Sequence, residues 1–449
     1  MKAKTQTQDN TPVNADVVVV GAGMVGLSSA IALSKAGLKV HVIEQRDVDL
    51  SGVETWLNDA RTQGYDPRVS ALTLASQQWL TYVGAWPHIK QQRLSPYTDM
   101  DVWDGEGSGH IHFSSRELHE AQLGHIVENR VTLAGLFIEA REASDLIWHQ
   151  GVTVKGLSAP SSKDKHTYRE ITLSDGAVLR AQLVIAADGA ESQVRKLAAV
   201  PMWMWDYGHH AIVTTVTTEK AHQATAWQRF TDDGPLAFLP LDDPFTCSIV
   251  WSTSPDHAAS LMALDDATFC QSLGRAFEHR LGQVVATEAR YKVPLKQRHA
   301  KQYVQAGLAL IGDAAHTIHP LAGQGVNLGF MDAAALTEQL IQAHKADQPL
   351  GDEALLRHYQ RERQQANIQM SAAMEGFKQL FGHQAPLLKT LRGLGMNLLN
   401  RLDPVKQHIV VRAMGLKGDL PALAERKVPL DAMPNARSKN DLVSPKGQV

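Results

Sequence analysis

The sequence predicts an α/β fold in which a parallel-sheet domain holds an inserted antiparallel-sheet (α+β) domain and is followed by C-terminal helices. One observation is a valine-rich run, 16–20, that leads through a glycine-rich turn into a helical pattern and a second apolar run, 38–43. Another is the region 205–294, where short β-type runs alternate with turns. A third is the mainly helical pattern after residue 311. The 449 residues are enough for two or three structural domains.

Composition excludes several classes of protein. The net charge of −3 argues against a nucleic-acid partner. The only cysteines, Cys247 and Cys270, are too few for a disulfide scaffold or a four-cysteine metal site. The polar segment 1–14 is predicted to be a disordered leader without the apolar stretch of a secretory signal. No apolar run reaches the roughly 18 residues that span a bilayer, so we expect a cytoplasmic protein.

The first motif is G-x-G-x-x-G at 21–26, between the first run and the helical pattern. In such a motif Gly21 permits a tight turn, Gly23 lets the backbone approach a pyrophosphate, and Gly26 lets helix and strand pack closely. Glu44 ends the second run, where a carboxylate can accept hydrogen bonds from ribose hydroxyls. A 2′-phosphate would sit badly against Glu44, which favours FAD or NAD over NADP. The alternative is a glycine-rich turn without a ligand.

The second motif follows a predicted strand. The runs 150–156, 168–173 and 178–186 are expected to be strands, with a turn at 174–176. Asp188 and Gly189 come directly after the last run, ahead of Ser192 and Arg195. By itself this pattern fits either a phosphate-facing loop or an ordinary strand–turn–helix connection.

The inserted domain and the C-terminal part are read from their periodicity. The runs 211–217, 236–239 and 247–251 predict strands, and 265–281 predicts a helix. After the run 309–311 the chain is predicted to be helical, including a C-terminal helical region at 346–424. The segment 425–449 has few apolar residues and is expected to be a flexible tail.

The third motif is Gly312-Asp313, followed by a glycine-rich loop that leads into a helix. Asp313 can bind the hydroxyl groups of a polyol chain, and the loop 320–327 can place backbone N–H groups beside a polar ring. An alternative is a metal site of Asp313, His316 and His319. Glycine and proline surround these residues and no matching ligand cluster occurs elsewhere, so no metal is expected.

Together the three motifs resemble those of the flavin-dependent aromatic hydroxylases, the single-component monooxygenases typified by para-hydroxybenzoate hydroxylase. The resemblance implies a Rossmann-like FAD-binding domain, with NAD(P)H or another electron donor as reductant. In that family the first motif holds the ADP half of FAD, the second lies near the pyrophosphate, the third binds the ribityl chain, and the following loop lies against the isoalloxazine. The cofactor-binding residues that the resemblance implies are Gly21, Gly23, Met24, Val25, Gly26, Glu44, Gln45, Arg68, Asn129, Asp188, Gly189, Gly312, Asp313, Pro320, Gly323, Gln324, Gly325, Val326 and Asn327.

One branch of that group, the ubiquinone-biosynthesis hydroxylases, is more similar still. The segments that look like this branch are 66–72, 124–129, 227–230, 234–241 and 312–328. Segments 100–104 and 205–211 look most like its 2-polyprenylphenol hydroxylases, which oxidise ring position C5. The resemblance implies a monooxygenase in which O₂ adds to reduced flavin, giving a C4a-hydroperoxide whose distal OH passes to a lipophilic phenol. The alternatives are a hydroxylase of the same branch acting at another ring carbon, an FAD dehydrogenase or reductase, and a non-catalytic flavin-bearing accessory subunit.

The candidate catalytic residues lie in two segments. A phenol is more nucleophilic as phenolate, so a proton acceptor would help; His209, His210 and Tyr207 are the candidates, and ordinary strand residues are the alternative. Pro320, in the predicted flavin loop, completes the catalytic set. Glu128 and Asn129 lie in a segment that the family uses near the flavin.

The C-terminal region suggests partners. Between 387 and 417, leucines recur at spacings of three and four with six basic residues against one acidic residue. Such a helix can lie on an anionic membrane, here the inner face, or pack on the protein's own core or a partner. A ubiquinone-biosynthesis complex and a homo-oligomer are the other partners expected. Three domain segments are predicted: an FAD-binding part at 15–200, a substrate domain at 201–299, and a closing FAD-binding segment at 300–345. Within the first of these, the segment 76–124 is expected to belong partly to the substrate region.

Overall fold

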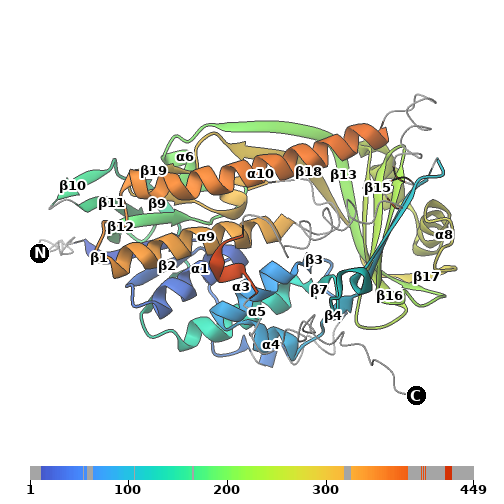
Figure 1. Ribbon diagram of the computed structural model, residues 1–449, viewed down its shortest axis with the longest axis horizontal. Coiled ribbons are helices and arrows are strands. Elements are labelled where there is room, and N and C mark those ends of the chain that lie inside the picture. Colours follow the sequence, from blue (N-terminus) through green and yellow to red (C-terminus); the bar gives the residue numbers. More distant parts are fainter. Residues whose placement is uncertain are drawn as a thin grey trace, which may run out of the picture.

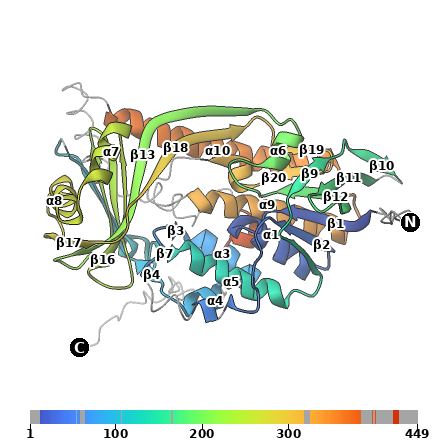
Figure 2. The same cartoon turned by 180° about the vertical axis from the view of Figure 1, so that it is seen from behind.

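Two large sheets lie end to end in the protein, and helix α10 (Glu353–Gly382) runs along both of them (Figure 1). The computed structural model describes residues 12–53, 55–57, 64–105, 107–163, 166–317, 325–382, 396, 398, 400 and 420–426. Figure 2, from behind, shows the N-terminal sheet at one end of the molecule and the second large sheet with its two helices at the other. The α/β prediction is confirmed.

The first sheet is mostly parallel at its centre. Its strand order is β10-β11-β12-β1-β2-β8, with β20 pairing with β12, β19 with β20, and β9 with β11. The parallel pairs are β1–β12, β1–β2, β2–β8 and β12–β20. The strands are β1 (Val13–Val20), β2 (Val40–Glu44), β8 (Leu146–Gln150), β9 (Val154–Leu157), β10 (Ser161–Lys163), β11 (His166–Leu173), β12 (Val178–Ala186), β19 (Val304–Gln305) and β20 (Leu308–Leu310).

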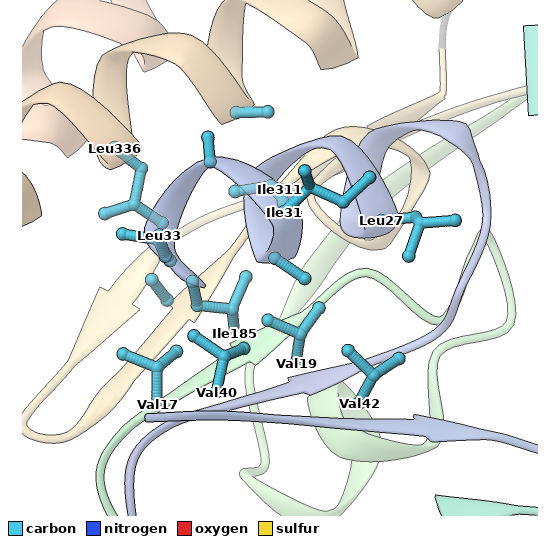
Figure 3. Packing of buried hydrophobic residues seen from close by; sticks show 14 of the residues in the cluster. Val17, Val19, Leu27, Ile31, Leu33, Val40, Val42, Ile185, Ile311 and Leu336 are labelled. Carbon is cyan, nitrogen blue, oxygen red and sulfur yellow. The ribbon is translucent and has the colours of Figure 1, made fainter. Parts of the chain in front are cut away.

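Helices pack on this sheet, and apolar side chains between the helices and the strands form the core. Figure 3 shows Leu27 and Ile31 of α1 over the valines of β1 and β2, with Leu336 of α9 on the other side of α1. These side chains are fully buried, which is why the valine-rich strands are apolar on both faces. The helices of this part are α1 (Met24–Lys35), α3 (Leu74–Val83), α4 (Trp86–Lys90), α5 (Asn129–Glu142), α6 (Gln193–Leu197), α9 (Gly325–Lys345) and the short turns η2 (Gly312–Ala314) and η4 (Ala422–Ala424). A further short turn, η1 (Ser115–Leu118), contacts the second large sheet.

The second large sheet is mainly antiparallel. Its order is β21-β18-β13-β16-β15-β14-β5-β6, with β17 on β13 and one parallel pair, β14–β5. The strands are β5 (Asp99–Asp104), β6 (His110–Ser114), β13 (Met202–Thr218), β14 (Thr225–Thr231), β15 (Gly234–Pro240), β16 (Thr246–Thr253), β17 (Val284–Thr287), β18 (Tyr291–Ala300) and β21 (His316–Thr317).

The two faces of this second sheet have different neighbours. One face, with Ile212 and Phe238, packs in a core with helices α7 (Pro255–Ala263) and α8 (Asp266–Ala276). The opposite face, with Ala226 and Leu239, packs against the small sheet β3-β7-β4 (Val69–Leu72, Gly124–Glu128 and Ser95–Tyr97). We call this opposite face the inner face, because it meets the small sheet and points toward the rest of the chain.

Three sequence predictions of local structure need correction. Strand β1 begins at Val13, inside the predicted leader, because it pairs with β12 from that residue onward. The predicted strand 150–156 is wrong: the chain leaves β8 at Gly151, whose φ of +67° suits a turn, before β9 begins. The helix predicted at 265–281 ends at Ala276, because Glu278 and His279 have positive φ, and helix α7 was not predicted.

The segment 76–124 divides between the two parts. Trp79, Val83 and Ile89 are buried in the core of the first sheet. Strands β5 and β6, by contrast, extend the second sheet. Only the second half of the segment therefore joins the second large sheet.

Candidate functional site

The three glycines of the first motif have three different environments. Gly21 has φ +102°, and a Cβ there would lie 2.5 Å from the carbonyl oxygen of Ala187. A Cβ on Gly26 would lie 2.2 Å from the carbonyl oxygen of Gly21, so helix and turn are in direct contact. A Cβ on Gly23, the residue before α1, would meet nothing within 4 Å. Gly23 thus leaves its backbone open to a ligand at the N-terminus of α1, where N–H groups are unpaired.

Glu44 closes this glycine turn. Its Oε2 accepts a hydrogen bond of 2.9 Å from the N–H of Ala22, and its Oε1 accepts one of 3.1 Å from the N–H of Arg46. A carboxylate has about four acceptor positions, so Glu44 keeps capacity for a ribose hydroxyl. Gln45 follows it as an exposed residue.

The first and third motifs meet through Val25. A Cβ on Gly329 of α9 would lie 2.7 Å from a Val25 methyl, and one on Gly312 would lie 3.2 Å from the other methyl. Gly312 also has φ +57°, which favours glycine. Met24 and Val25 are half-buried at the start of α1. The motifs, nearly 300 residues apart in the sequence, therefore form one surface.

Asp313 is accessible although its neighbours Gly312 and Ala314 are buried. Desolvation by the surrounding protein raises the pKa of its carboxyl group, against the lowering effects of His316, Arg68 and Arg298. A carboxylate that solvent can reach, yet that dense protein surrounds, is suited to accept hydrogen bonds from the hydroxyls of a bound polyol.

A buried carboxylate holds the turn that presents Asp313. Asp332 of α9 accepts hydrogen bonds through Oδ2 from the N–H of Gly312 (3.1 Å) and from Nε2 of His316 (2.5 Å). Its Oδ1 accepts from Nε of Arg363 (3.1 Å) and Nδ2 of Asn367 (3.0 Å), both on α10. Burial alone would raise the pKa of Asp332, but the charges of His316 and Arg363 and these hydrogen bonds lower it. The carboxylate is therefore ionised and fully paired.

The network continues to the second sheet. Asn367 also donates to the Tyr303 hydroxyl (3.3 Å), which lies 3.0 Å from Nε2 of His299. His299 and His316 are register partners in the β18–β21 pair. Asp332 and Arg363 were not predicted from the sequence, although a charged residue within the apolar stretch 328–336 indicates a buried partner. With its ring nitrogen bound to Asp332, His316 is committed to this network.

The second motif forms a strand–turn–helix connection and leaves one carboxylate oxygen without a partner among the described residues. Oδ2 of Asp188 accepts from the N–H groups of Gln193 (2.7 Å) and Val194 (3.1 Å), so it caps α6. Its Oδ1 is buried and has no hydrogen-bond partner among the described residues. Arg195 does not face a phosphate: it donates to the carbonyls of Ala190 (2.8 Å) and Ala314 (2.9 Å). It thereby joins the second motif to the third.

Glu128 has a structural role. Its carboxylate, 2% exposed, pairs with Arg93 at 3.0 Å and Arg130 at 2.7 Å and accepts from the N–H of Asp66 (2.7 Å). These contacts hold the segment that carries Arg68, which is exposed. Oδ1 of Asn129 accepts from Ser70 (2.6 Å), and its N–H donates to the carbonyl of Arg68 (2.9 Å).

The predicted flavin loop is described only from Gly325 onward. Gly325 and Val326 begin α9. Asn327 is buried and binds the chain itself: Nδ2 donates to the carbonyl of Ala71 (2.8 Å), and Oδ1 accepts from Ser76 (2.7 Å). Pro320, Gly323 and Gln324 lie outside the described residues, as does His319. Among the residues that are described, no group of His, Cys, Asp or Glu is arranged to hold a metal ion.

His209 and His210 point to opposite faces of the second sheet. His209 pairs with Leu295 and shares the inner face with Ala211. His210 pairs with Thr253 and shares the face of Ile212, the one that packs against α7 and α8. The two therefore cannot act on the same ligand from the inner face. The side chain of Tyr207 is outside the described part, and Gly189 is open, with nothing within 4 Å of a Cβ.

Comparison with known proteins identifies this arrangement. The FAD-binding domain family matches residues 14–373. The chain belongs to this family. Its relatives include the 3-demethoxyubiquinol 3-hydroxylase of Escherichia coli K12, 37% identical over 89% of this chain and 98% of the relative. The human mitochondrial ubiquinone biosynthesis monooxygenase COQ6 is 33% identical over 89% and 92% of the two chains, and the ubiquinone hydroxylase UbiL of Rhodospirillum rubrum is 35% identical over 93% and 94%.

Solved structures share the fold. PqsL, a probable FAD-dependent monooxygenase of Pseudomonas aeruginosa, is 21% identical with a TM-score of 0.69 over 85% of this chain and 99% of its own. The p-nitrophenol 4-monooxygenase PnpA of Pseudomonas putida is 20% identical with a TM-score of 0.68 over 91% and 100%. The protein is thus an FAD-dependent, aromatic-ring hydroxylating oxidoreductase of the ubiquinone-biosynthesis hydroxylase group.

The residues present fit FAD. The open position at Gly23, the unpartnered Oδ1 of Asp188 and the accessible Asp313 lie on turns that Val25 and Arg195 connect. Each is the kind of group that a pyrophosphate, ribose or ribityl chain requires. Among the described helices, none is long and apolar enough to cross a membrane.

Proposed function

We propose that this protein hydroxylates the aromatic ring of a polyprenylated phenol in ubiquinone biosynthesis, at C5 of a 2-polyprenylphenol. The observation that carries the proposal is the pairing of β21 with β18, which joins the Asp313 turn directly to the sheet whose inner face holds His209. A flavin held by that turn would reach a ring bound on this face. Bound FAD would supply the oxygen-transfer chemistry, after reduction by NAD(P)H or another donor.

Residues of the chain would position the cofactor. Gly23 and the N-terminus of α1 would face the pyrophosphate, Glu44 the ribose, and Asp313 the ribityl hydroxyls. Arg68 would lie at the same site, because its charge acts on Asp313. The other proposed contacts are Gly21, Met24, Val25, Gly26, Gln45, Asn129, Asp188, Gly189, Gly312 and 320–327. Among them, the half-buried side chain of Asn129 and the buried side chain of Asn327 act mainly by holding their segments.

His209 is the proposed acceptor for the phenol proton. It lies on the inner face, and an imidazole is the side chain best matched to proton transfer near neutral pH. His210 loses this role because it lies on the opposite face. Pro320 stays a proposed catalytic position in the flavin loop.

Isotope-labelled turnover tests the proposal. The FAD-loaded protein would be supplied with a 2-polyprenylphenol, NADH or NADPH, and ¹⁸O₂. We expect one labelled oxygen on the ring, at C5 by NMR of the product. Formation of hydrogen peroxide without labelled product would contradict hydroxylation of this substrate. A gene deletion followed by mass spectrometry of the accumulated quinone precursor would report the same missing oxygen in the cell.

A second ring position is favoured by one observation. The relative that is 37% identical over 98% of its length is named for 3-hydroxylation of 3-demethoxyubiquinol. If labelled oxygen entered demethoxyubiquinol and not 2-polyprenylphenol, that position would be correct. The proposed contact of 387–417 with the inner face of the membrane lies largely outside the described residues. Membership of a biosynthetic complex and homo-oligomer formation are likewise proposals.

A further inference from the structure

An exposed aromatic ribbon is the most unusual surface of the protein. Trp203, Met204 and Trp205 are consecutive and 43%, 70% and 51% exposed. They lie in the first half of β13, which pairs with the second half of β18. Both views show this long strand along the outer margin of the molecule (Figures 1 and 2). Trp203 and Trp205 share one face of the strand, with ring centres 6.4 Å apart, and Met204 points to the other face. The edge therefore exposes large apolar side chains on both faces, which marks it as a contact surface.

The ribbon contains basic residues and little acid. Between 291 and 302 the chain carries four basic and no acidic residues, and β13 adds only Asp206 between 202 and 210. Of the four basic residues, Arg298 is paired with Glu191. The other three, Lys292, Lys296 and Lys301, are exposed. Lys301 Nζ lies 5.7 Å from the Trp203 ring centre. The surface thus complements an anionic partner.

The apolar area extends onto α10. The Gln364 amide of this helix donates to the carbonyl of Lys301 at 3.1 Å. Ile368 lies one turn later on the same side of α10 and is 44% exposed. The exposed apolar side chains of β13 and α10 are therefore linked through the segment around Lys301, which contacts both elements.

We propose that this ribbon, defined as 202–206 with 296–301, docks on an anionic lipid bilayer. Tryptophan prefers the headgroup region of a membrane, and lysines beside it are attracted to anionic headgroups. The outer edge of 202–206 has no strand partner among the described residues. Its N–H and C=O groups need hydrogen-bond partners, which the headgroup layer supplies and the hydrocarbon does not. The ribbon would therefore lie at headgroup depth.

Contact between the ribbon and the membrane would bring the inner face of the sheet near the bilayer, where a polyprenylated phenol resides. Only this consequence rests on the proposed function. Docking itself can be measured without turnover. A failure to dock is therefore distinguishable from a failure to hydroxylate.

Vesicle co-sedimentation of the full-length, FAD-loaded protein tests the proposal. The vesicles would be phosphatidylcholine alone or mixed equally with phosphatidylglycerol, at low salt. Trp203 is left unchanged because it packs against His299, with the two rings tilted and their centres 6.0 Å apart. The apolar variant is Met204→Ser with Trp205→Ser, and the charge variant is Lys296→Gln with Lys301→Gln. Matched controls are Trp56→Ser, 44% exposed in another segment, and Lys155→Gln with Lys220→Gln.

We expect the wild-type protein to bind mixed vesicles, and each ribbon variant to bind them about tenfold more weakly. The controls should bind as the wild type does. Flavin content and melting temperature should be unchanged, which excludes misfolding as the cause. Three results would overturn the proposal. The first is no vesicle binding by the wild type. The second is equal binding by the ribbon variants and the wild type, which would assign docking to another region such as 387–417. The third is conversion of an oligomer to a monomer by the apolar variant without any vesicle binding, which would assign the ribbon to contact with a second copy of the chain.

Discussion

Polar side chains have different surroundings at the turn 312–316 and on the inner face of the second sheet. At the turn, Asp332 is completely buried and every acceptor oxygen has a partner from β21, the turn or α10. On the inner face, His209 is half-buried beside the apolar Ala211 and Leu295. The turn is held in a single geometry by its hydrogen bonds, whereas the sheet face around His209 offers apolar contacts beside a histidine.

This difference assigns different tasks to the two regions. A cofactor that stays bound benefits from a rigid, fully hydrogen-bonded frame, because the groups around it then do not have to rearrange during turnover. A substrate that enters and leaves needs apolar contact and a proton acceptor. Substitutions at the turn should therefore act on stability and FAD affinity, and substitutions on the sheet face should act on turnover.

The largest effect should come from Asp332→Ala. It would leave Arg363 buried without its carboxylate and remove the partner of His316 and of the Gly312 N–H. Removing one partner of a buried ion pair costs about 3–5 kcal/mol. Urea unfolding of the FAD-free protein measures this loss, and flavin fluorescence measures FAD affinity. Asp256→Ala, an exposed acid in α7, is the control and should change stability by less than about 0.5 kcal/mol. A stability equal to that of the control would show that the network does not hold the turn.

The next prediction separates the two histidines. His209→Gln should lower kcat/KM near neutral pH by about a hundredfold, the lower end of what a positioned base contributes. Activity should recover toward pH 10, because a phenol loses its proton without the help of a base at about that pH. His210→Gln should leave the pH profile unchanged, since its side chain is on the opposite face. Equal losses in both variants, or an unchanged profile for His209→Gln, would remove the proton-transfer role.

Sequence alone predicted the local parts of the site. The three glycines at 21–26 lie close together in the sequence, so their spacing is enough to recognise the motif, and β12 was predicted with its observed bounds. Asp332, Arg363 and Asn367 could not be found in this way, because their partners come from turns and helices that only the fold brings together. The faces of His209 and His210 also needed the structure. The register of β13 shifts between Asp206 and His209, so alternation from Trp205 onward does not show which histidine faces inward.

A glycine pair tests whether packing and ligand contact are separate within the first motif. Gly26→Ala should destabilise the FAD-free protein by about 1–3 kcal/mol, because its Cβ would overlap the Gly21 carbonyl. Gly23→Ala should leave that stability within about 0.5 kcal/mol, since its Cβ meets no protein atom, yet weaken FAD binding. Thermal unfolding without FAD and a fluorescence titration with FAD measure the two properties. Gly23→Ala with wild-type FAD affinity would contradict an approach of the pyrophosphate at this position.

The last effect concerns pH, and it compares a buried histidine of the first sheet with the half-buried His209. Burial lowers the pKa of His41 to about 4, with added lowering by His149 and Lys39, from an ordinary value of 6.5. Between those pH values the unfolded chain binds the proton and the folded protein does not, so the free energy of unfolding falls as pH falls from about 6.5 to 4. One such group contributes a slope of at most about 1.4 kcal/mol per pH unit. His41→Gln should reduce the measured slope in urea unfolding, whereas His344→Gln, at an exposed position in α9, should not. A slope that His41→Gln leaves intact would assign the acid sensitivity to other buried histidines, of which His125 also has its pKa lowered to about 4 by burial and by Lys90.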